Sequence, residues 1–439
     1  MNLAALLVAA AAGVTPWSAP ATLSPCRASG APQVVFPSDS PSETTGTGAV
    51  VWSAAAGCVG GEGARVAGIG PGDVPGVSAS VRGAAGRLLP PRGPLLASGA
   101  PRGRIVIAGA APAGGTAGLL VQGAVGGPFA TLKPEGTATQ PLALARAYLG
   151  DVALAYRASG GFDVHVERFY ANHFSRETSV RSAGSAPVRE LTLAMDYRSE
   201  VLAVWVQGGA IYARLLPADG PARPLQRLAR VGERAHVAAL LSDDGRAIVA
   251  WSEQHGNQTS VYIDRSGNGV RFHAAQLLER FSDPDELSAP AASPSLVRLS
   301  SESVMLAWAG AGAGHWVVRT ASVYKSGVGD TGTIAAPGAD VLLQCLAAGP
   351  AADALVLWTQ PPPRTGGPAD LDQEAIFAAM GFDAADQRTA FGAAEMVAAP
   401  GPVDDLGAAF DPDSNRAVAV WRGQGGRIEY SIRELARTP

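Results

Sequence analysis

The stretch Ala247-Ile248-Val249-Ala250-Trp251 decides the fold, because its pattern of apolar residues ending in an aromatic returns along the whole chain. Neighbouring copies lie from 46 residues (Trp205 to Trp251) to 63 residues (Trp358 to Trp421) apart. Self-similarity at such a period indicates a repeat architecture. Further copies end at Trp52, Tyr156, Trp205, Trp308, Trp358 and Trp421, and a weaker copy without the aromatic runs from Arg104 to Ala108.

The unit around Trp251 predicts four antiparallel strands. Residues 235–241 form a first strand, and the Asp-Gly turn at 242–245 leads into a second strand that ends at Trp251. This second strand has few polar residues, so we expect it to be buried on both faces. A polar loop follows it, and residues 259–264 then alternate as a half-exposed strand does. A fourth strand at residues 271–278 completes the sheet.

Four-stranded units at this period predict an all-β fold, a β-propeller. A lone unit cannot bury both faces of its sheet, whereas blades packed face to face around a channel can. The eight copies predict eight blades, with seven blades and an irregular unit as the alternative. Six of the eight tryptophans stand at the motif position, where we expect them to wedge against the neighbouring blade. We expect residues 33–36 to form the first inner strand, and residues around 22–29 to close the ring.

The composition excludes some classes of partner. The chain has 439 residues, 16% of them charged, and a net charge of −4, so no positive field attracts nucleic acid or an anionic membrane. Residues 1–14 form an apolar stretch of signal-peptide length, and Ala19-Pro20-Ala21 fits a cleavage site. We therefore expect a signal peptide at 1–21, a single propeller domain at 22–439 that is not an integral membrane protein, and a secreted or extracytoplasmic location.

The three cysteines fall into two groups. Cys26 and Cys58 flank the first copy of the motif, at the same rim of one predicted blade. Because export permits disulfides, we predict a bridge between them, which would stabilise the fold by roughly 3–4 kcal/mol. Cys345 lies in an apolar run and is expected to be an inert, buried thiol.

At the level of its repeat pattern the chain resembles secreted bacterial propellers of the broad sialidase-like group. Their repeats also place an aliphatic strand ending in Trp after a polar turn. The resemblance extends from Gln33 to the end and implies the propeller fold. The Asp-box of sialidases, Ser-x-Asp-x-Gly-x-Thr-Trp, has no copy here, and Ser242-Asp243-Asp244-Gly245 has the wrong spacing. No activity is therefore carried over from the resemblance.

Candidate ligand-binding residues lie in the loop after each second strand, which opens at the predicted channel mouth. Arg157 and Arg422 directly follow a motif aromatic, so two blades present a guanidinium that could bind a carboxylate or sulfate. Glu253 and His255 could form an acid–base pair, and Gln360 occupies the corresponding loop of another blade. For each residue a solvated rim position is the competing interpretation.

These observations favour a non-catalytic extracytoplasmic propeller that binds a glycan, a peptide or an envelope protein at its channel mouth. The alternative is a carbohydrate-active enzyme, a sialidase-like hydrolase or a lyase, that uses acids and arginines of that face. A purely structural envelope component is a third hypothesis. A channel mouth with two carboxylates about 5–10 Å apart, beside Arg157 or Arg422, would favour the enzyme. The histidines lack ligand spacing, and we expect no cofactor, no metal and a monomer.

Overall fold

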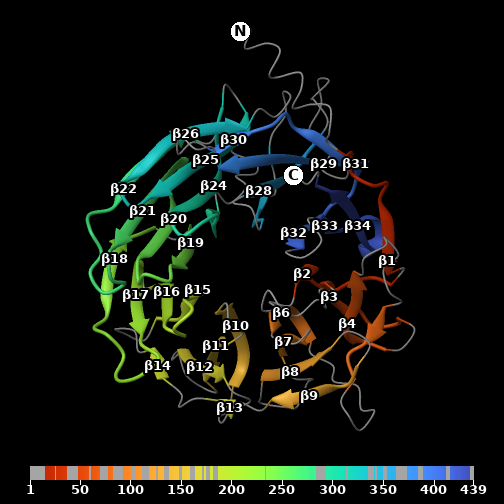
Figure 1. Ribbon diagram of the computed structural model, residues 1–439, viewed down its shortest axis with the longest axis horizontal. Coiled ribbons are helices and arrows are strands. Elements are labelled where there is room, and N and C mark those ends of the chain that lie inside the picture. Colours follow the sequence, from red (N-terminus) through yellow and green to blue (C-terminus); the bar gives the residue numbers. More distant parts are fainter. Residues whose placement is uncertain are drawn as a thin grey trace.

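The computed structural model is a closed ring of eight antiparallel sheets whose inner strands surround a common axis (Figure 1). Within the described residues, no helix is long and apolar enough to cross a membrane. The structure describes residues 15–24, 26–36, 48–58, 61–69, 78–82, 92–100, 104–110, 118–124, 127–132, 138–147, 151–158, 164–170, 173–174, 178–180, 186–232, 234–282, 293–312, 315–334, 341, 344–349, 353–361, 373–383, 389–411 and 416–435.

Each sheet is one blade, and its strands follow one another from the inner to the outer edge. Blades 1 to 4 consist of β2 (Gln33–Val35), β3 (Gly48–Ala54), β4 (Gly63–Ile69) and β5 (Ala79–Ser80); β6 (Arg92–Ala100), β7 (Arg104–Ala110), β8 (Gly118–Ala124) and β9 (Phe129–Leu132); β10 (Ala138–Arg146), β11 (Val152–Ala158), β12 (Val164–Tyr170), β13 (His173–Phe174) and β14 (Thr178–Val180); and β15 (Val188–Met195), β16 (Val201–Gln207), β17 (Ala210–Leu216) and β18 (Gln226–Arg230).

Blades 5 to 8 continue the same order. They consist of β19 (Arg234–Leu241), β20 (Ala247–His255), β21 (Gln258–Ser266) and β22 (Gln276–Ser282); β23 (Ser295–Arg298), β24 (Ser303–Ala311), β25 (Trp316–Tyr324) and β26 (Val328–Ile334); β27 (Gln344–Ala348), β28 (Asp353–Gln360), β29 (Glu374–Asp383), β30 (Thr389–Phe391) and β31 (Glu395–Gly401); and β32 (Asp405–Asp411), β33 (Arg416–Arg422), β34 (Ile428–Glu434) and β1 (Ala21–Ser24), with the 3-10 turn η2 (Gln424–Gly426) before β34.

The predicted propeller and its eight blades are confirmed, and the seven-blade alternative is wrong. The weak motif copy without an aromatic forms β7, a regular second strand of blade 2. The fourth strand of blade 5 begins at Gln276 rather than at Arg271. The side chain of Asn268 accepts hydrogen bonds from the backbone N–H groups of Val270 and Arg271, so this stretch first forms a turn.

The ring is closed by the beginning of the chain. β1 pairs antiparallel with β34, Ala21 opposite Tyr430, and so becomes the outer strand of blade 8. This confirms that a strand near residues 22–29 completes the last blade. The pairing continues towards the N-terminus, because the Ser18 N–H donates to the Ile432 carbonyl at 2.8 Å. The neighbouring Trp17 is buried in the core between blades 7 and 8.

The motif aromatics form the core between blades, as predicted. The side chain of Trp251 packs with residues of β16 in blade 4, and no more than 2% of any of the six motif tryptophans is exposed. In each blade that has a motif aromatic, the structure also shows a neighbour for it within the sheet. This neighbour is the residue opposite the aromatic on the third strand. Trp251 stacks on Tyr262, and Trp205 on Tyr212. In other blades this position holds a charged residue, as where Arg319 lies opposite Trp308.

The two ends of the ring differ in which strands finish there. We call the end where the second strands finish the motif end, because the motif aromatics lie near it. The opposite end, where the first strands finish, is the hairpin end. At the hairpin end Asp243 joins three blades, because it forms an ion pair with Arg298 of blade 6 and accepts from the Tyr197 N–H of blade 4 at 3.2 Å.

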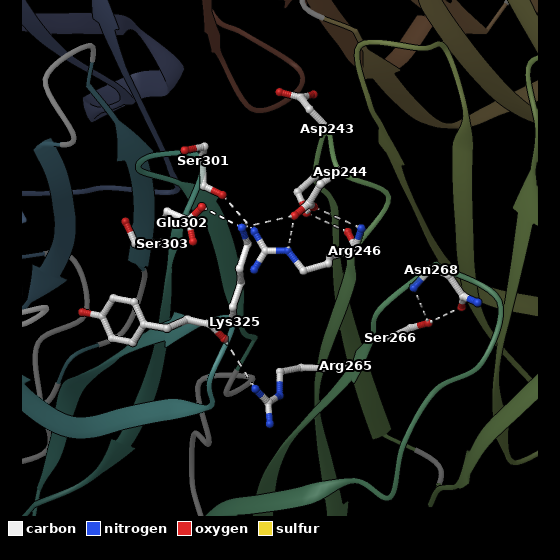
Figure 2. Close-up of polar contacts among 12 residues, drawn as sticks. Asp243, Asp244, Arg246, Arg265, Ser266, Asn268, Ser301, Glu302, Ser303 and Lys325 are labelled. Carbon is white, nitrogen blue, oxygen red and sulfur yellow. Dashed lines mark hydrogen bonds and ion pairs between the residues drawn. The ribbon is translucent and has the colours of Figure 1, made fainter.

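A network of polar contacts at the hairpin end joins blades 5 and 6 (Figure 2) through the Arg246–Ser301 hydrogen bond and the Lys325–Asp244 contact. Arg246 Nε lies 2.7 Å from Asp244 Oδ2, and its Nη2 donates to the Ser301 carbonyl at 2.8 Å. Lys325 Nζ contacts Glu302 at 2.7 Å and Asp244 at 3.8 Å. Most of these side chains are partly exposed, so each pair is worth little alone, but together they join neighbouring blades.

The same end holds blades 3 and 1 together across blade 2. Arg146 of β10 donates to the Phe36 carbonyl at 3.1 Å. The contact passes over Gly99 of β6, where a Cβ atom would lie 2.6 Å from the Arg146 Nη1 and 2.0 Å from the Phe36 oxygen. A side chain at this position would therefore block the contact, which explains why glycine stands there.

Candidate binding site at the motif end

The structure distributes the predicted ligand-binding residues over the motif end rather than gathering them. Arg157 lies in β11 of blade 3, but its side chain is outside the described residues. Glu253 and His255 end β20 in blade 5, Gln360 ends β28 in blade 7, and Arg422 ends β33 in blade 8. These residues therefore belong to four blades, and each has to be considered with its own neighbours.

Glu253 and His255 lie side by side without a hydrogen bond. His255 Nε2 is 3.6 Å from Glu253 Oε2, and the histidine is exposed whereas the glutamate is only 9% exposed. Glu253 Oε2 has no hydrogen-bond partner in the structure, and neither has the indole nitrogen of Trp251, two residues earlier. In blade 4, by contrast, Gln207 Oε1 accepts from the Trp205 indole at 3.3 Å.

Gln360 has the role that Gln207 has in blade 4. Its side chain is buried, and its Oε1 accepts from the Trp358 indole at 3.4 Å. Side chains two residues apart on a strand share a face. Gln360 therefore follows Trp358 into the interface with blade 6.

Arg422 is neutralised within the protein. Its Nη2 lies 2.8 Å from Asp405 Oδ2, and its Nε lies 3.4 Å from Asp404 Oδ2. Asp405 begins β32 and is paired in register with Arg422, and Asp404 precedes it and is largely exposed. A guanidinium with two carboxylates beside it has little capacity left for an anionic ligand.

Glu374 adds a third carboxyl group from blade 7. It is 6% exposed, and within the part of the chain that the structure describes its Oε2 has no hydrogen-bond partner. Burial raises the pKa of the Glu374 carboxyl, the Asp404 charge raises it further, and a hydrogen bond from the Thr359 hydroxyl opposes the rise. Burial also raises the pKa of Asp405, with Arg422 opposing. We call Glu374, Asp404, Asp405 and Arg422 the acid corner.

The strand periodicity explains why these groups meet. Leu357 of β28 and Ile376 of β29 belong to the core between blades 7 and 8. Thr359 and Glu374 lie two residues from them and therefore face the same interface. The Asp404 N–H donates to the Arg422 carbonyl at 3.0 Å, which fixes the connection into blade 8 against the end of β33.

The sequence interpretation found Arg422 but missed the three acids. It considered only the loops after the second strands. The connections into the first strands reach the same end of the ring, and the doublet Asp404-Asp405 in one of them was the available signal. Nothing local marks Glu374, which the packing of blade 7 against blade 8 brings near Asp404.

Cys26 and Cys58 are neighbours at the seam between blades 8 and 1. Both are free thiols in this structure. Burial, aided by a hydrogen bond with Cys26, raises the pKa of Cys58 to about 11. The Ala55 N–H donates to the Arg27 carbonyl at 2.8 Å, which holds the two segments together. The predicted bridge stays a prediction. Among the described residues, no group of three or more His, Cys, Asp or Glu side chains could hold a metal ion.

No model of a known protein family matches the chain, and no curated protein sequence matches it. Solved propeller-containing structures are similar in fold. A prolyl endopeptidase matches at 11% identity with a TM-score of 0.45 over 76% of this chain, which spans 49% of that protein. A catalytically inactive virginiamycin B lyase from Staphylococcus aureus matches at 11% identity with a TM-score of 0.43, over 76% of this chain and 92% of its own.

A subtype N10 neuraminidase-like protein of A/little yellow-shouldered bat/Guatemala/060/2010 is also among the similar structures. It matches at 8% identity with a TM-score of 0.38, over 66% of this chain and 93% of its own. This is the group that the repeat pattern resembles. At such identities the likeness concerns the propeller fold and says nothing about activity.

Proposed function

We propose that this propeller is a non-catalytic binding module that holds its ligand at the motif end. The observation that carries the proposal is the buried Glu374 Oε2, which has no hydrogen-bond partner among the described residues and lies in a corner with an excess of acid. Leaving a buried polar atom unsatisfied costs about 1–3 kcal/mol, so such an atom requires an explanation. A ligand that supplies the missing donor is one.

The distribution of charge over the ring supports the same end. At the hairpin end, Asp243 and Arg246 have partners on neighbouring blades and so contribute to holding the ring together. In the acid corner of the motif end, three acids, Glu374, Asp404 and Asp405, stand against one arginine, Arg422. Acids that are not engaged in joining blades, such as Glu374 and Asp404, are available to bind a partner.

The leader supports an extracytoplasmic site of action. An apolar stretch at 1–14 and the cleavage pattern at 19–21 are typical of an exported protein, and we propose a glycan, peptide or envelope protein as the class of partner. Cleavage after Ala21 would keep most of β1 but remove Trp17 from its position between blades 7 and 8. N-terminal sequencing of the native protein tests this part directly.

A thermal-shift screen of the full chain tests the binding function. The panel contains acidic and neutral glycans, short cationic and anionic peptides, Ca²⁺ and EDTA. A ligand present at 100 times its Kd stabilises the protein by about 2.7 kcal/mol, which is readily measured. We expect a shift that is lost when motif-end acids are neutralised and kept when Asp243 is changed. A flat screen, or a shift that depends only on hairpin-end residues, contradicts the proposal.

A hydrolase or lyase is the second candidate, and one observation favours it. Glu374 has a raised pKa and Asp404 lies close enough to contribute to it, which is how an acid and a base of unequal pKa are separated in glycosidases. Turnover of any glycan that gives a thermal shift separates the two functions. Hydrolysis that disappears in Glu374→Gln and Asp404→Asn would establish the enzyme, and binding without turnover would establish the module.

A further inference from the structure

The geometry points to a primary ammonium group as the ligand of the acid corner, with Glu374 Oε2 as its buried acceptor and Asp404 as its exposed one. The inference rests on the proposed function and names the chemical class of its ligand. A lysine side chain, an amino sugar or a polyamine would each present such a group. What they share is a compact cation with N–H donors.

The charge of the corner selects a cation. Two carboxyl groups, of Asp404 and Asp405, already engage Arg422. The third, of Glu374, is paired in register with Gly401 and lies close enough to Asp404 to be affected by its charge. The raised pKa of Glu374 reflects its burial first and the charge of Asp404 second. An anion would add to this repulsion, and a bound cation would relieve it.

The unsatisfied atom selects a cation that donates hydrogen bonds. The Thr359 hydroxyl donates to the Glu374 carboxylate, but Oε2 is left without a donor. Glu374 is more than nine-tenths buried, so water replaces a donor there poorly. An N–H donor from a charged ligand would make a charge-assisted hydrogen bond, which is roughly twice as strong as a neutral one.

The arrangement of acceptors favours ammonium over a metal ion or a guanidinium. Among the described residues, no group of three or more His, Cys, Asp or Glu side chains could hold a metal ion, so the acid corner does not supply the ligands of a metal site. A guanidinium is a rigid planar fork that suits two oxygens of one carboxylate. Here one Glu374 oxygen is taken by Thr359, so the free acceptors belong to different residues on different blades. The three rotatable donors of an ammonium can reach acceptors placed in this way.

Binding should strengthen as the pH rises. The ionisable group whose charge acts on Glu374 is Asp404, in the connection into blade 8, and Asp404 is itself paired with Arg422. Because the pKa of Glu374 is raised, its carboxyl is protonated over a wider range of acidic pH than usual and cannot then accept from an ammonium. Deprotonation creates the acceptor, so affinity increases as the pH passes upward through this pKa.

The test is calorimetric titration of the full chain with n-butylammonium at neutral pH and low salt. Tetramethylammonium is the matched control ligand, because it carries the same charge without an N–H donor. We expect butylammonium to bind at least about tenfold more tightly than tetramethylammonium, a difference of about 1.4 kcal/mol. Equal affinities, or tighter binding of methylguanidinium than of butylammonium, would overturn the inference.

Two variants locate the site. Glu374→Gln should weaken butylammonium binding at least about tenfold and flatten its pH dependence, and Asp404→Asn should weaken it about threefold. Asp196→Asn is the matched control, since Asp196 is a buried hairpin-end acid with a raised pKa and an oxygen that has no partner among the described residues, and it should leave the affinity unchanged. Equal losses in Glu374→Gln and Asp196→Asn contradict the inference. Should Glu374→Gln not fold, the exposed Asp404 carries the test.

The outcome also separates this inference from the function on which it rests. No binding of butylammonium, together with a different ligand that depends on motif-end residues, overturns the ammonium site and leaves the binding module standing. No binding of any ligand at the motif end overturns both.

Discussion

The hairpin end and the motif end of this ring are built from the same residue types but use them in opposite ways. At the hairpin end, Asp243 and Asp244 contact cations from neighbouring blades. At the motif end, Asp404 and Asp405 contact one arginine of their own blade while Glu374 leaves an oxygen unmatched. Asp243 and Asp244 therefore contribute to cohesion of the ring, whereas Glu374 carries a cost in stability that the fold itself does not require. The hairpin end also holds a comparable group, the buried Asp196 Oδ2, which has no hydrogen-bond partner among the described residues.

The largest change in stability is expected from a buried ion pair at the hairpin end. Arg416 Nη2 lies 2.8 Å from Asp411 Oδ2, and both side chains are almost inaccessible. Arg416→Leu should destabilise the protein by about 3–5 kcal/mol, because it leaves a buried carboxylate without its cation. Urea unfolding measures this loss. The double variant Asp411→Leu/Arg416→Leu should recover most of it, and a loss below about 1 kcal/mol in the single variant would show that this end does not depend on its ion pairs.

The second test concerns the thiols at the motif end of the seam. Oxidation of Cys26 and Cys58 by a small-molecule disulfide such as glutathione disulfide would form one S–S bond and release two reduced thiols. The bridge should raise stability by up to about 3–4 kcal/mol, by restricting the unfolded chain. The melting temperature with and without a reducing agent measures it. Cys345→Ser should leave the redox difference unchanged, and Cys26→Ser should abolish it; a difference that persists in Cys26→Ser contradicts the bridge.

A smaller effect is expected from the exposed contacts that join blades 4, 5 and 6. Asp243→Ala removes the partner of Arg298 and of the Tyr197 N–H. Because these side chains are partly exposed, the loss should be about 1 kcal/mol, and it should shrink in high salt. Glu302→Ala removes one exposed contact to Lys325 and should cost less than half as much. Equal losses would show that linking three blades adds nothing to the value of an ion pair.

The smallest effect should have the opposite sign. Glu374→Gln replaces a buried acid of raised pKa by a neutral group of the same shape, so it should leave stability unchanged or increase it slightly near neutral pH. The native state binds the Glu374 proton more tightly than the unfolded state does. The free energy of unfolding therefore falls as the pH rises from the pKa of Glu374 in the unfolded state to its raised pKa in the folded state. Unfolding at several pH values measures this. A stability gap that favours wild type as pH rises contradicts the assigned role.

The architecture could be predicted because its signals are local. Each motif copy, such as the one ending at Trp251, carries its own turn, buried strand and aromatic, and eight of them fix the number of blades. The closing strand could be located because one strand was missing at the end of the chain. Even the burial of Gln360 follows from alternation, since it shares a face with Trp358, although the sequence interpretation placed it at a channel mouth.

The acid corner could not be predicted in the same way, because it depends on contacts between blades. Glu374 and Arg422 belong to different sheets, and no periodicity relates them. Which acids meet Arg422 depends on how the connection from β31 to β32 passes over the end of β33. The sequence interpretation therefore identified Arg422, whose chemistry is easily recognised. It did not identify the neighbouring acids, which determine what Arg422 can bind.

The closure of the ring has a consequence for how the protein is made. Ser18 and Ser431, which come into contact at the last blade, are 413 residues apart. The first strand to leave the ribosome must therefore wait for the last blade to be synthesised before it can pair. Until then β34 has no partner at its outer edge, and an unpaired edge is a template for pairing with another chain. Folding of this ring has a high contact order at its final step, and a chain shortened at either end would remain open at the same place.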